Sequence, residues 1–284
     1  MSQRMTKDLA GKTYVITGAN TGIGKITAKH LASRGAKVIL ACRSRDKTQP
    51  VLDEIANETG VTPDFVALDL GDFASVRHAA DEILAKHVPI DGLVNNAGLV
   101  ARGTTKDGFE LVFGTNHLGH YLFTRLLLER IKSAHGRIVN VASDSHYGAK
   151  AIDWEAVRKP TKSVTGYREY EVSKLANVLF TKELARRLEH DGVTTYAVHP
   201  GVVGTNVWRR VPPPFRWVMK KFMLTPEQGA VSSIRAATAP ELAKELGRYY
   251  KADGSEKRPS QLADDADLAK QLWQRSAEWT GLPA

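Results

Sequence analysis

The chain has 284 residues, 42% of them hydrophobic, with a single cysteine and a formal net charge of +9. This hydrophobic content is enough for a buried core, and the length corresponds to one large domain or two small ones. One cysteine excludes an intrachain disulfide, and no apolar stretch approaches the about 20 residues that are needed to span a bilayer.

The positive charge is spread along the chain, with 40 Lys and Arg against 31 Asp and Glu. No zinc-ligand spacing, aromatic RNA-reading motif or long basic run accompanies it, so we expect no nucleic-acid partner. A small molecule that carries phosphate is the expected partner. The opening MSQRMTKDLAGKTYVITG does not contain the apolar core of a signal peptide, and we expect a cytoplasmic protein.

Six short runs dense in Val, Ile, Leu and Tyr are typical of buried strands. They cover residues 12–18, 36–42, 64–70, 90–96, 137–143 and 193–201. Segments with helical spacing of apolar residues lie between them, for example 22–35 and 170–192. Alternating strands and helices build right-handed crossovers and a parallel sheet covered on both faces. We therefore predict an α/β fold, a doubly wound parallel sheet in one domain over 1–284.

The character of the chain changes after Gly201. Residues 202–226 contain three consecutive prolines among Trp, Arg, Phe, Lys and Met, and proline there ends regular structure. We expect a helix over 226–238, a weak seventh strand over 247–253 and a last helix over 267–279.

The segment TGANTGIG follows the first strand directly and opens a helix. Glycines let the backbone turn tightly and approach a pyrophosphate, whose charge is met by the helix N-terminus. This context predicts a dinucleotide site, with an ordinary strand-to-helix turn as the alternative. The residues assigned to the site are Gly18, Asn20, Thr21, Gly22, Ile23 and Gly24.

The second strand ends where an acidic residue would bind the ribose of NAD, but the chain has Cys42 followed by Arg43 there. The guanidinium of Arg43 suits a 2′-phosphate, so NADP is the predicted cofactor and NAD the alternative. A solvated loop charge is the other interpretation of Arg43. We expect Cys42 to be a packed strand residue and not a reactive thiol.

The stretch GYREYEVSK, residues 166–174, places two tyrosines ahead of a lysine. Residues four apart share a helix face, so Tyr170 faces Lys174, whereas Tyr167 is expected to be a substrate-pocket or surface aromatic. A free phenol is a sluggish acid near neutrality, and a nearby ammonium should lower its pKa. The pair is therefore a candidate for proton transfer.

Together and in order, these motifs resemble the short-chain dehydrogenase/reductase family from about residue 10 to the C-terminus. Several segments are similar to sequences of the retinol dehydrogenase branch, namely TGANTGIGK, LACR, DGFE, NHLGH and SKLANVLFTKELARRL. The resemblance implies a Rossmann-type fold and an NADP(H)-dependent oxidoreductase that interconverts a lipophilic alcohol and its aldehyde or ketone. Two departures are that Ala142 replaces a serine and that the opening residues do not resemble the apolar anchor of membrane-bound members; the second puts a retinoid substrate in doubt.

The resemblance also implies roles for individual residues. Tyr170 exchanges the proton, Lys174 binds the nicotinamide ribose, Ser143 hydrogen-bonds the substrate oxygen, and Asn116 holds a water that links the lysine to solvent. The further cofactor contacts that it implies are Asp69, Leu70, Asn95, Ala97, Gly98, Pro200, Gly201, Val203 and Thr205.

Two histidines, His117 and His120, lie three residues apart without a third ligand. This is typical of packing or helix-capping residues, so we predict no metal site. Residues 207–224 lie where family members place a mobile lid over the substrate, and their interleaved aromatic and basic side chains indicate a lipophilic substrate. Peripheral contact with an anionic membrane is the alternative for this segment.

Helix faces along 107–130 and 169–190 resemble those that pair in dimers and tetramers of the family, and related reductases with extended C-termini are monomers. The sequence therefore predicts either a homo-oligomer or a monomer. A regulatory or scaffold protein that binds a dinucleotide without turnover is the alternative function. The intact set of Asn116, Ser143, Tyr170 and Lys174 argues against it.

Overall fold

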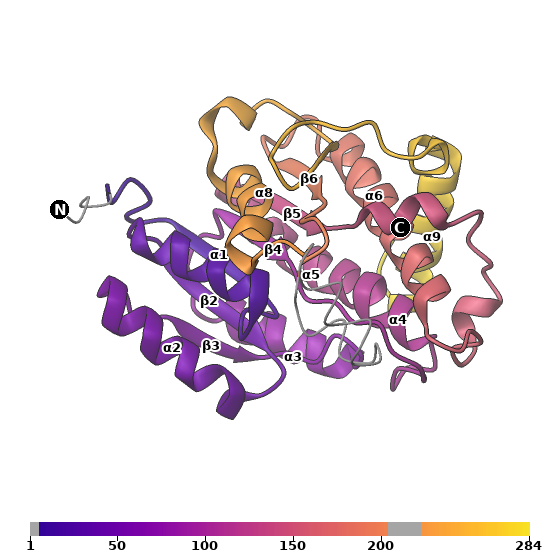
Figure 1. The fold of residues 1–284 in the computed structure, drawn as a ribbon, viewed down its shortest axis with the longest axis horizontal. Coiled ribbons are helices and arrows are strands. Elements are labelled where there is room, and N and C mark those ends of the chain that lie inside the picture. Colours follow the sequence, from indigo (N-terminus) through magenta and orange to yellow (C-terminus); the bar gives the residue numbers. More distant parts are fainter. Residues whose placement is uncertain (1–5, 204–222) are drawn as a thin grey trace.

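A parallel sheet of seven strands forms the centre of the computed structural model, which describes residues 6–203 and 223–284 (Figure 1). The strands are β1 (Thr13–Thr17), β2 (Lys37–Cys42), β3 (Asp64–Ala67), β4 (Gly92–Asn95), β5 (Arg137–Val141), β6 (Thr194–Val198) and β7 (Arg248–Tyr250). Their order is β3-β2-β1-β4-β5-β6-β7, and every neighbouring pair is parallel. The predicted fold class is confirmed, including the weak seventh strand.

Helices connect the strands and cover both faces of the sheet. The α-helices are α1 (Gly22–Ser33), α2 (Arg45–Thr59), α3 (Phe73–Leu84), α4 (Leu111–Phe113), α5 (Gly119–Ser133), α6 (Tyr167–Arg187), α8 (Pro226–Thr238) and α9 (Ala266–Thr280). Shorter elements are the π-helix η1 (Gly114–Leu118) and the 3₁₀ turns η2 (Asp144–Gly148), η3 (Ala156–Arg158), η5 (Pro240–Leu242) and η6 (Gln261–Asp264). The single domain therefore has three layers.

Each face of the sheet has its own apolar core. On one face, Leu31 of α1, Leu52 of α2 and Ala236 of α8 pack with sheet residues such as Ile16. On the other face, residues of α3, α5 and α6 form a second cluster. The chain reverses its winding between β1 and β4, and in sheets of this kind ligands bind in the crevice at the carboxyl ends of the strands beside such a reversal.

Helix α8 begins and ends where the sequence predicts. Thr225 accepts a hydrogen bond from the backbone of Gln228, whose side chain in turn accepts from the backbone of Thr225, and Pro226 occupies the first turn. Such a reciprocal cap fixes a helix start locally. The helical stretch within 107–130 is divided among α4, η1 and the first part of α5.

The C-terminal helix α9 packs outside α5 and α6. Trp273 is buried, and its ring lies 5.2 Å from that of Tyr121 and 6.1 Å from that of Phe180. The guanidinium groups of Arg125 and Arg187 lie over the Trp273 ring at 4.7 and 4.3 Å. Helix α9 of the same chain thus packs on the outer faces of α5 and α6. These are the helix faces that resemble the subunit contacts of family dimers and tetramers.

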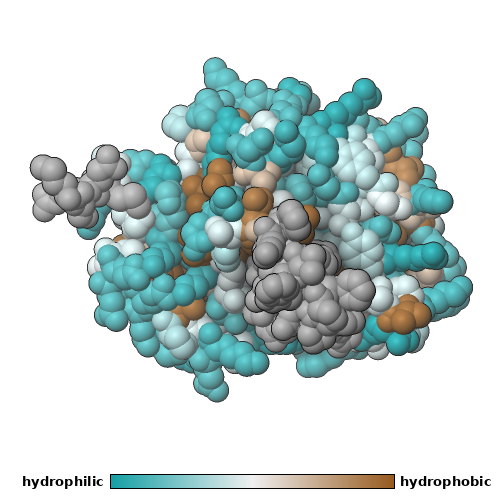
Figure 2. Space-filling model, in the orientation of Figure 1, coloured by the Kyte–Doolittle hydropathy of each residue, from teal (hydrophilic) through white to brown (hydrophobic). Residues whose placement is uncertain are grey.

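The surface in Figure 2 is hydrophilic over most of the visible face, with apolar residues gathered near its middle. Among the helices of residues 6–203 and 223–284, none combines the length and the apolar character that a bilayer span requires.

Candidate active site

The glycine-rich turn packs directly against the loop that follows β4. Gly18 has φ +65°, and a Cβ there would lie 2.9 Å from the Cα of Ala97. A Cβ on Gly24 would lie 2.4 Å from the Asn96 side-chain nitrogen and 2.7 Å from the Gly18 carbonyl oxygen. Because neither position has room for a side chain, the turn and the loop form one continuous backbone surface.

The N-terminus of α1 fits an anion. Thr21 is its N-cap but gives no side-chain hydrogen bond to the first turn, so the first backbone N–H groups are not capped from within. Gly22 has φ +57°, which brings the chain into the helix. Asn20 and Ile23 flank this start. The arrangement supports binding of a pyrophosphate at the helix N-terminus.

The end of β2 lies beside this turn. The Gly18 N–H donates to the Ala41 carbonyl at 2.9 Å, and Cys42 is buried against the backbone of the turn. Burial raises the pKa of the Cys42 thiol, which confirms the expectation of a packed, unreactive cysteine. Arg43 is exposed immediately after it, at the position that the sequence assigns to a 2′-phosphate.

The residues after β3 and at the end of β4 that the resemblance assigns to the cofactor lie in different surroundings. Asp69 accepts a hydrogen bond from the Gly71 backbone at 3.0 Å and is partly exposed, whereas Leu70 is buried. Asn95 donates to Thr124 at 2.9 Å and to Asn140 at 2.8 Å. Its side chain is therefore committed to the interior of the sheet.

Asn96 is a residue that the sequence analysis did not name. Its side-chain nitrogen donates to the Thr17 carbonyl at 2.8 Å and to the Gly18 carbonyl at 3.3 Å. Asn96 thereby fixes the glycine-rich turn from the neighbouring strand. Residues 95–98, NNAG, contain the signal, but the sequence does not show which of the two asparagines points toward the turn.

Tyr170 and Lys174 lie together at the carboxyl end of β5, as the spacing predicts. The Lys174 ammonium nitrogen lies 5.4 Å from the centre of the Tyr170 ring and donates to the Val141 carbonyl at 2.7 Å. A Cβ on Gly98 would lie 3.6 Å from that nitrogen and from the Asn116 side-chain oxygen. Gly98 therefore forms part of the wall of this site.

The expected direction of the Tyr170 pKa shift is wrong. Burial raises the pKa of Tyr170 to about 12, and a hydrogen bond with Ser143 opposes this only in part. Burial also lowers the pKa of Lys174 to about 7. Each group is removed from water, and this desolvation outweighs the attraction between the ammonium and a phenolate.

Ser143 lies at the N-cap of η2, where its hydroxyl oxygen accepts from the Ser145 backbone at 3.1 Å. The hydroxyls of Ser143 and Ser145 are also 3.1 Å apart, and that of Ser145 lies 3.0 Å from the Tyr167 hydroxyl. Tyr167 sits in the first turn of α6, with its ring 6.0 Å from that of Tyr170. The structure thus places Tyr167 beside the site, as a half-exposed aromatic.

Asn116 lies in the π-helix η1 and is fully buried. Its side-chain oxygen accepts from the Leu99 backbone at 2.9 Å, and its nitrogen donates to the Leu99 carbonyl at 3.0 Å and to Ser173 at 3.1 Å. The side chain therefore ties the loop after β4 to helix α6. Short π-helical segments are frequent at functional sites.

The turn after Ser143 is held by two imidazoles. His146 bonds to the Ser143 carbonyl at 2.7 Å, and the Asp144 backbone N–H donates to His199 at 3.1 Å. The Asp144 carboxylate accepts from Tyr249 at 2.8 Å and from Lys257 at 2.9 Å. These bonds fix the backbone around Ser143.

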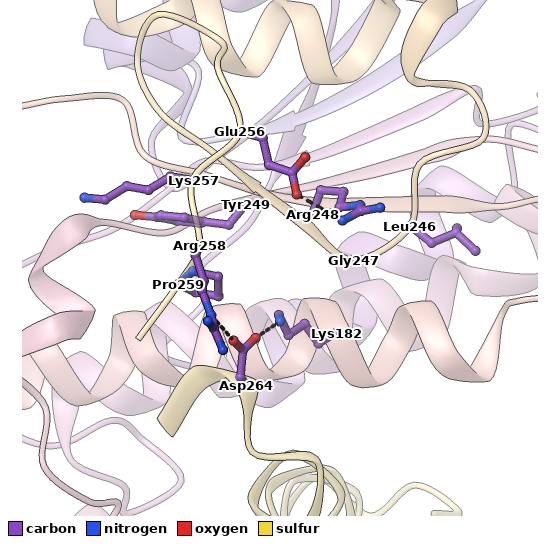
Figure 3. Close-up of a pocket in the computed structure, with 10 residues that line it drawn as sticks. All are labelled: Lys182, Leu246, Gly247, Arg248, Tyr249, Glu256, Lys257, Arg258, Pro259 and Asp264. Atoms are coloured by element: carbon purple, nitrogen blue, oxygen red, sulfur yellow. Dashed lines mark hydrogen bonds and ion pairs between the residues drawn. The ribbon is translucent and has the colours of Figure 1, made fainter. Parts of the chain in front are cut away.

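A cavity of about 540 Å³ lies at the edge of the sheet beside β7 (Figure 3). Its lining includes the pairs Arg248 with Glu256 and Lys182 with Asp264. Tyr249 lines it and also reaches Asp144, so the cavity backs onto the Ser143 turn. None of the candidate catalytic residues lines it, and we do not assign it to the substrate.

The segment after β6 packs against α8, which also contacts the glycine-rich turn. Gly201 has φ +82°, and Val203 forms a bridge with Leu224. A Cβ on Gly229 of α8 would lie 2.5 Å from Val203, 3.2 Å from the Pro200 carbonyl and 3.3 Å from Ile23. Gly229 thus lets α8 touch both the Pro200 segment and the glycine-rich turn. Thr205 and most of the lid at 202–226 lie outside the described residues.

The two histidines of η1 and α5 are both buried. Burial lowers the pKa of His117 to about 3 and that of His120 to about 4, so both rings are neutral at physiological pH. Within residues 6–203 and 223–284, no group of three or more His, Cys, Asp or Glu side chains is placed to hold a metal ion.

Comparison with known proteins gives the same picture as the geometry. A profile of the short chain dehydrogenase family matches residues 12–214. The chain belongs to the short chain dehydrogenase family. Human retinol dehydrogenase 13 is 42% identical over 292 residues, which cover 97% of this chain and 86% of that protein. The protein is therefore a member of the retinol dehydrogenase-like branch and an oxidoreductase that acts on CH–OH groups with NAD(P).

Solved structures of short chain dehydrogenases share the fold. An uncharacterised protein of Mycobacterium paratuberculosis has a TM-score of 0.79 and 34% identity, covering 99% of this chain and 100% of that one. A Beutenbergia cavernae protein described as an NAD(P) dependent gluconate 5-dehydrogenase has a TM-score of 0.71 and 28% identity, covering 87% of this chain and 97% of that one. The latter structure contains NADP.

Proposed function

We propose that this short chain dehydrogenase uses NADP(H) to interconvert a lipophilic alcohol and its aldehyde or ketone. The observation that carries the proposal is the convergence of the partly buried Tyr170 with the buried Lys174 and Ser143 at the carboxyl end of β5. A carbonyl oxygen that receives hydride needs a proton donor and a hydrogen bond, and these side chains supply both.

Tyr170 is the proposed proton donor. With its pKa raised to about 12, the phenol keeps its proton at neutral pH, which is the form required to protonate a carbonyl oxygen. Ser143 accepts the Ser145 backbone N–H and donates its own hydrogen to the Ser145 hydroxyl, so a substrate oxygen would take the place of the Ser145 hydroxyl as the acceptor. The protonated phenol favours reduction at neutral pH.

Lys174 is proposed to stabilise the phenolate that remains after proton donation. Its bond to the Val141 carbonyl holds it beside the Tyr170 ring, and its pKa of about 7 lets it gain or lose a proton near neutrality. The Asn116 side chain is fully bonded to Leu99 and Ser173. The Asn116 backbone carbonyl accepts from the His120 ring at 3.0 Å, and we propose that its second lone pair is what Asn116 offers to a water near Lys174.

NADPH, when bound, supplies the hydride. The glycine-rich turn and the N-terminus of α1 would hold its pyrophosphate, and the exposed Arg43 would pair with its 2′-phosphate. Asp69 and Lys174 would contact the adenine and the nicotinamide ribose. The absence of a carboxylate at the end of β2 supports NADP over NAD.

The lipophilic substrate class is supported by exposed apolar side chains on the segments next to the site. Val164 is 85% exposed, Val202 49% and Tyr167 37%. Val164 precedes α6, Val202 follows β6, and the Tyr167 ring lies 6.0 Å from that of Tyr170. The cytoplasmic location and the membrane contact of residues 207–224 stay predictions.

The test is NADPH consumption with a panel of aliphatic, aromatic and polyhydroxylated carbonyl compounds. We expect turnover with lipophilic aldehydes or ketones, and a loss of about 10²- to 10⁴-fold in Tyr170→Phe. Tyr167→Phe is the matched control, since it removes a neighbouring hydroxyl and should keep most of the activity. Equal rates in wild type and Tyr170→Phe would eliminate the proposed donor.

A further inference from the structure

Thr17, the last residue of β1, is the centre of a buried hydrogen-bond chain. Its hydroxyl oxygen accepts the backbone N–H of Asn96 at 2.9 Å and that of Ala97 at 3.0 Å. The same oxygen lies 2.9 Å from Nε2 of His120. Because two N–H groups already donate to this oxygen, the Thr17 hydroxyl hydrogen is the one that points to His120.

This direction fixes the tautomer of His120. Nε2 accepts from Thr17, so in the neutral ring the proton is on Nδ1. Nδ1 lies 3.0 Å from the Asn116 carbonyl oxygen, to which it donates. The ring is buried and neutral, since burial lowers its pKa to about 4 and the charge of Lys174 acts in the same direction. Both ring nitrogens are therefore satisfied, in one orientation only.

The second buried histidine of this region, His117, does not have both ring nitrogens hydrogen-bonded. His117 is equally buried and bonds to Ser276 through Nε2 at 3.0 Å, but its Nδ1 has no partner among the described residues. Its ring packs among Phe113, Tyr121 and Phe180. His117 is a packing residue that faces α9, whereas His120 faces the site.

We propose that His120 is a positioning residue, which holds the Asn116 backbone carbonyl in place beside Lys174 and joins it to the cofactor-side loop through Thr17. The chain runs from the backbone of Asn96 and Ala97, through Thr17 and the imidazole, to the π-helix. This role rests on the proposed function, because the carbonyl matters only where Lys174 exchanges protons.

The chemistry makes the imidazole hard to replace. A π-helical turn disturbs the regular i, i+4 ladder, and here a side chain meets the carbonyl from outside the ladder. Only a group that accepts at one end and donates at the other can join Thr17 to Asn116. Movement of a catalytic element by about 1 Å costs on the order of 100-fold in rate.

Matched substitutions separate the two ends of the ring. In His120→Asn the amide nitrogen can stand where Nδ1 stands, so the bond to the Asn116 carbonyl is kept. In His120→Gln the amide oxygen can reach Thr17, but the donor to Asn116 is lost. His120→Asn loses only the acceptor for Thr17, so we expect its kcat to fall a few-fold, whereas kcat of His120→Gln, which loses the donor to Asn116, should fall roughly 10- to 100-fold.

The NADPH dissociation constant and the urea midpoint of the two variants serve as controls and should be similar to each other. Equal kcat in the two variants, or losses of kcat that follow their urea midpoints, would overturn the positioning role. Thr17→Ser, which keeps the hydroxyl, should behave as wild type, whereas Thr17→Val should lower kcat.

A measurement without turnover tests the chain itself. In ¹⁵N-histidine-labelled protein, the His120 signals, assigned by their loss in His120→Gln, should show a protonated Nδ1 and an unprotonated Nε2 from pH 5 to pH 8. The opposite tautomer, or titration in that range, would overturn the assignment of His120 alone. Absence of wild-type turnover with every carbonyl would instead overturn the proposed function.

Discussion

The Lys174 ammonium nitrogen lies 5.4 Å from the centre of the Tyr170 ring, and its hydrogen bond is made to the Val141 carbonyl 2.7 Å away. Both side chains are withdrawn from water, so the lysine has lost most of its preference for the charged form. Burying Lys174 therefore lowers the stability of the folded protein, and this cost should be measurable in the free energy of unfolding.

We predict that Lys174→Met is more stable than wild type at pH 7, and that the difference shrinks as the pH rises. The pKa of Lys174 is about 7 in the fold and 10.5 in the unfolded chain, so the unfolded state binds more protons between these values. Wild-type stability should therefore gain about 1.4 kcal/mol per pH unit relative to the variant over that range. Urea unfolding at pH 7, 8.5 and 10 measures this.

Lys257→Met is the control with the opposite sign. The hydrogen bond to Asp144 raises the pKa of Lys257, so its contribution to stability is present below the unfolded pKa and is lost as the pH rises past the folded pKa. This variant should be slightly less stable than wild type at pH 7. A Lys174→Met protein with a pH-independent stability difference would refute the depressed pKa.

Gly24→Ala should weaken NADPH binding at least about tenfold while the protein stays folded. The new Cβ would stand 2.4 Å from the Asn96 side-chain nitrogen and force the glycine-rich turn and the loop after β4 apart. Fluorescence titration with NADPH measures the change. Gly60→Ala, at a position with φ +71° and no atom within 4 Å, should lose some stability but no affinity; equal affinity losses would exclude our explanation.

Arg43→Asp should shift cofactor preference from NADPH toward NADH by roughly 10- to 100-fold in kcat/KM, the effect of losing a charge-assisted hydrogen bond. Arg45→Asp is the control, because the Arg45 guanidinium lies over the Phe65 ring, 5.3 Å from its centre. If the ratio of kcat/KM for NADPH and NADH is unchanged in Arg43→Asp, then Arg43 does not bind the 2′-phosphate.

Trp273→Ala should lower the free energy of unfolding by about 3 to 5 kcal/mol, because a large buried ring leaves a cavity between α5, α6 and α9. Trp154, which is only partly buried, is the control and should cost less when replaced by Ala. We expect urea midpoints to separate the two variants clearly. Similar midpoints would mean that α9 is not an integral layer of the fold.

The sequence predicts the elements well because their signals are local. Helix α8 is correct to the residue, since Thr225 and Gln228 cap it from within four positions. The strands are correct in place, but all except β2 end earlier than predicted. The third, for example, ends at Ala67, because Asp69 and Leu70 already belong to the loop that carries the site.

The sequence predicts the site less completely, since its remaining parts depend on distant contacts. Spacing alone pairs Tyr170 with Lys174, but the burial that raises one pKa and lowers the other comes from the surrounding layers. His120 was placed among packing residues because its partner Thr17 lies 103 positions away. The spacing of residues along the chain does not indicate a hydrogen bond between residues so far apart.

The burial of Cys42 under the glycine-rich turn gives the protein a native reporter. Since the chain contains one cysteine, a thiol reagent can react at this place alone, and only when the turn lifts away from β2. The labelling rate therefore measures how often that opening occurs. A ligand that stabilises the glycine-rich turn would lower the rate of Cys42 labelling. Occupancy of the cofactor site could therefore be followed without an added dye and without turnover.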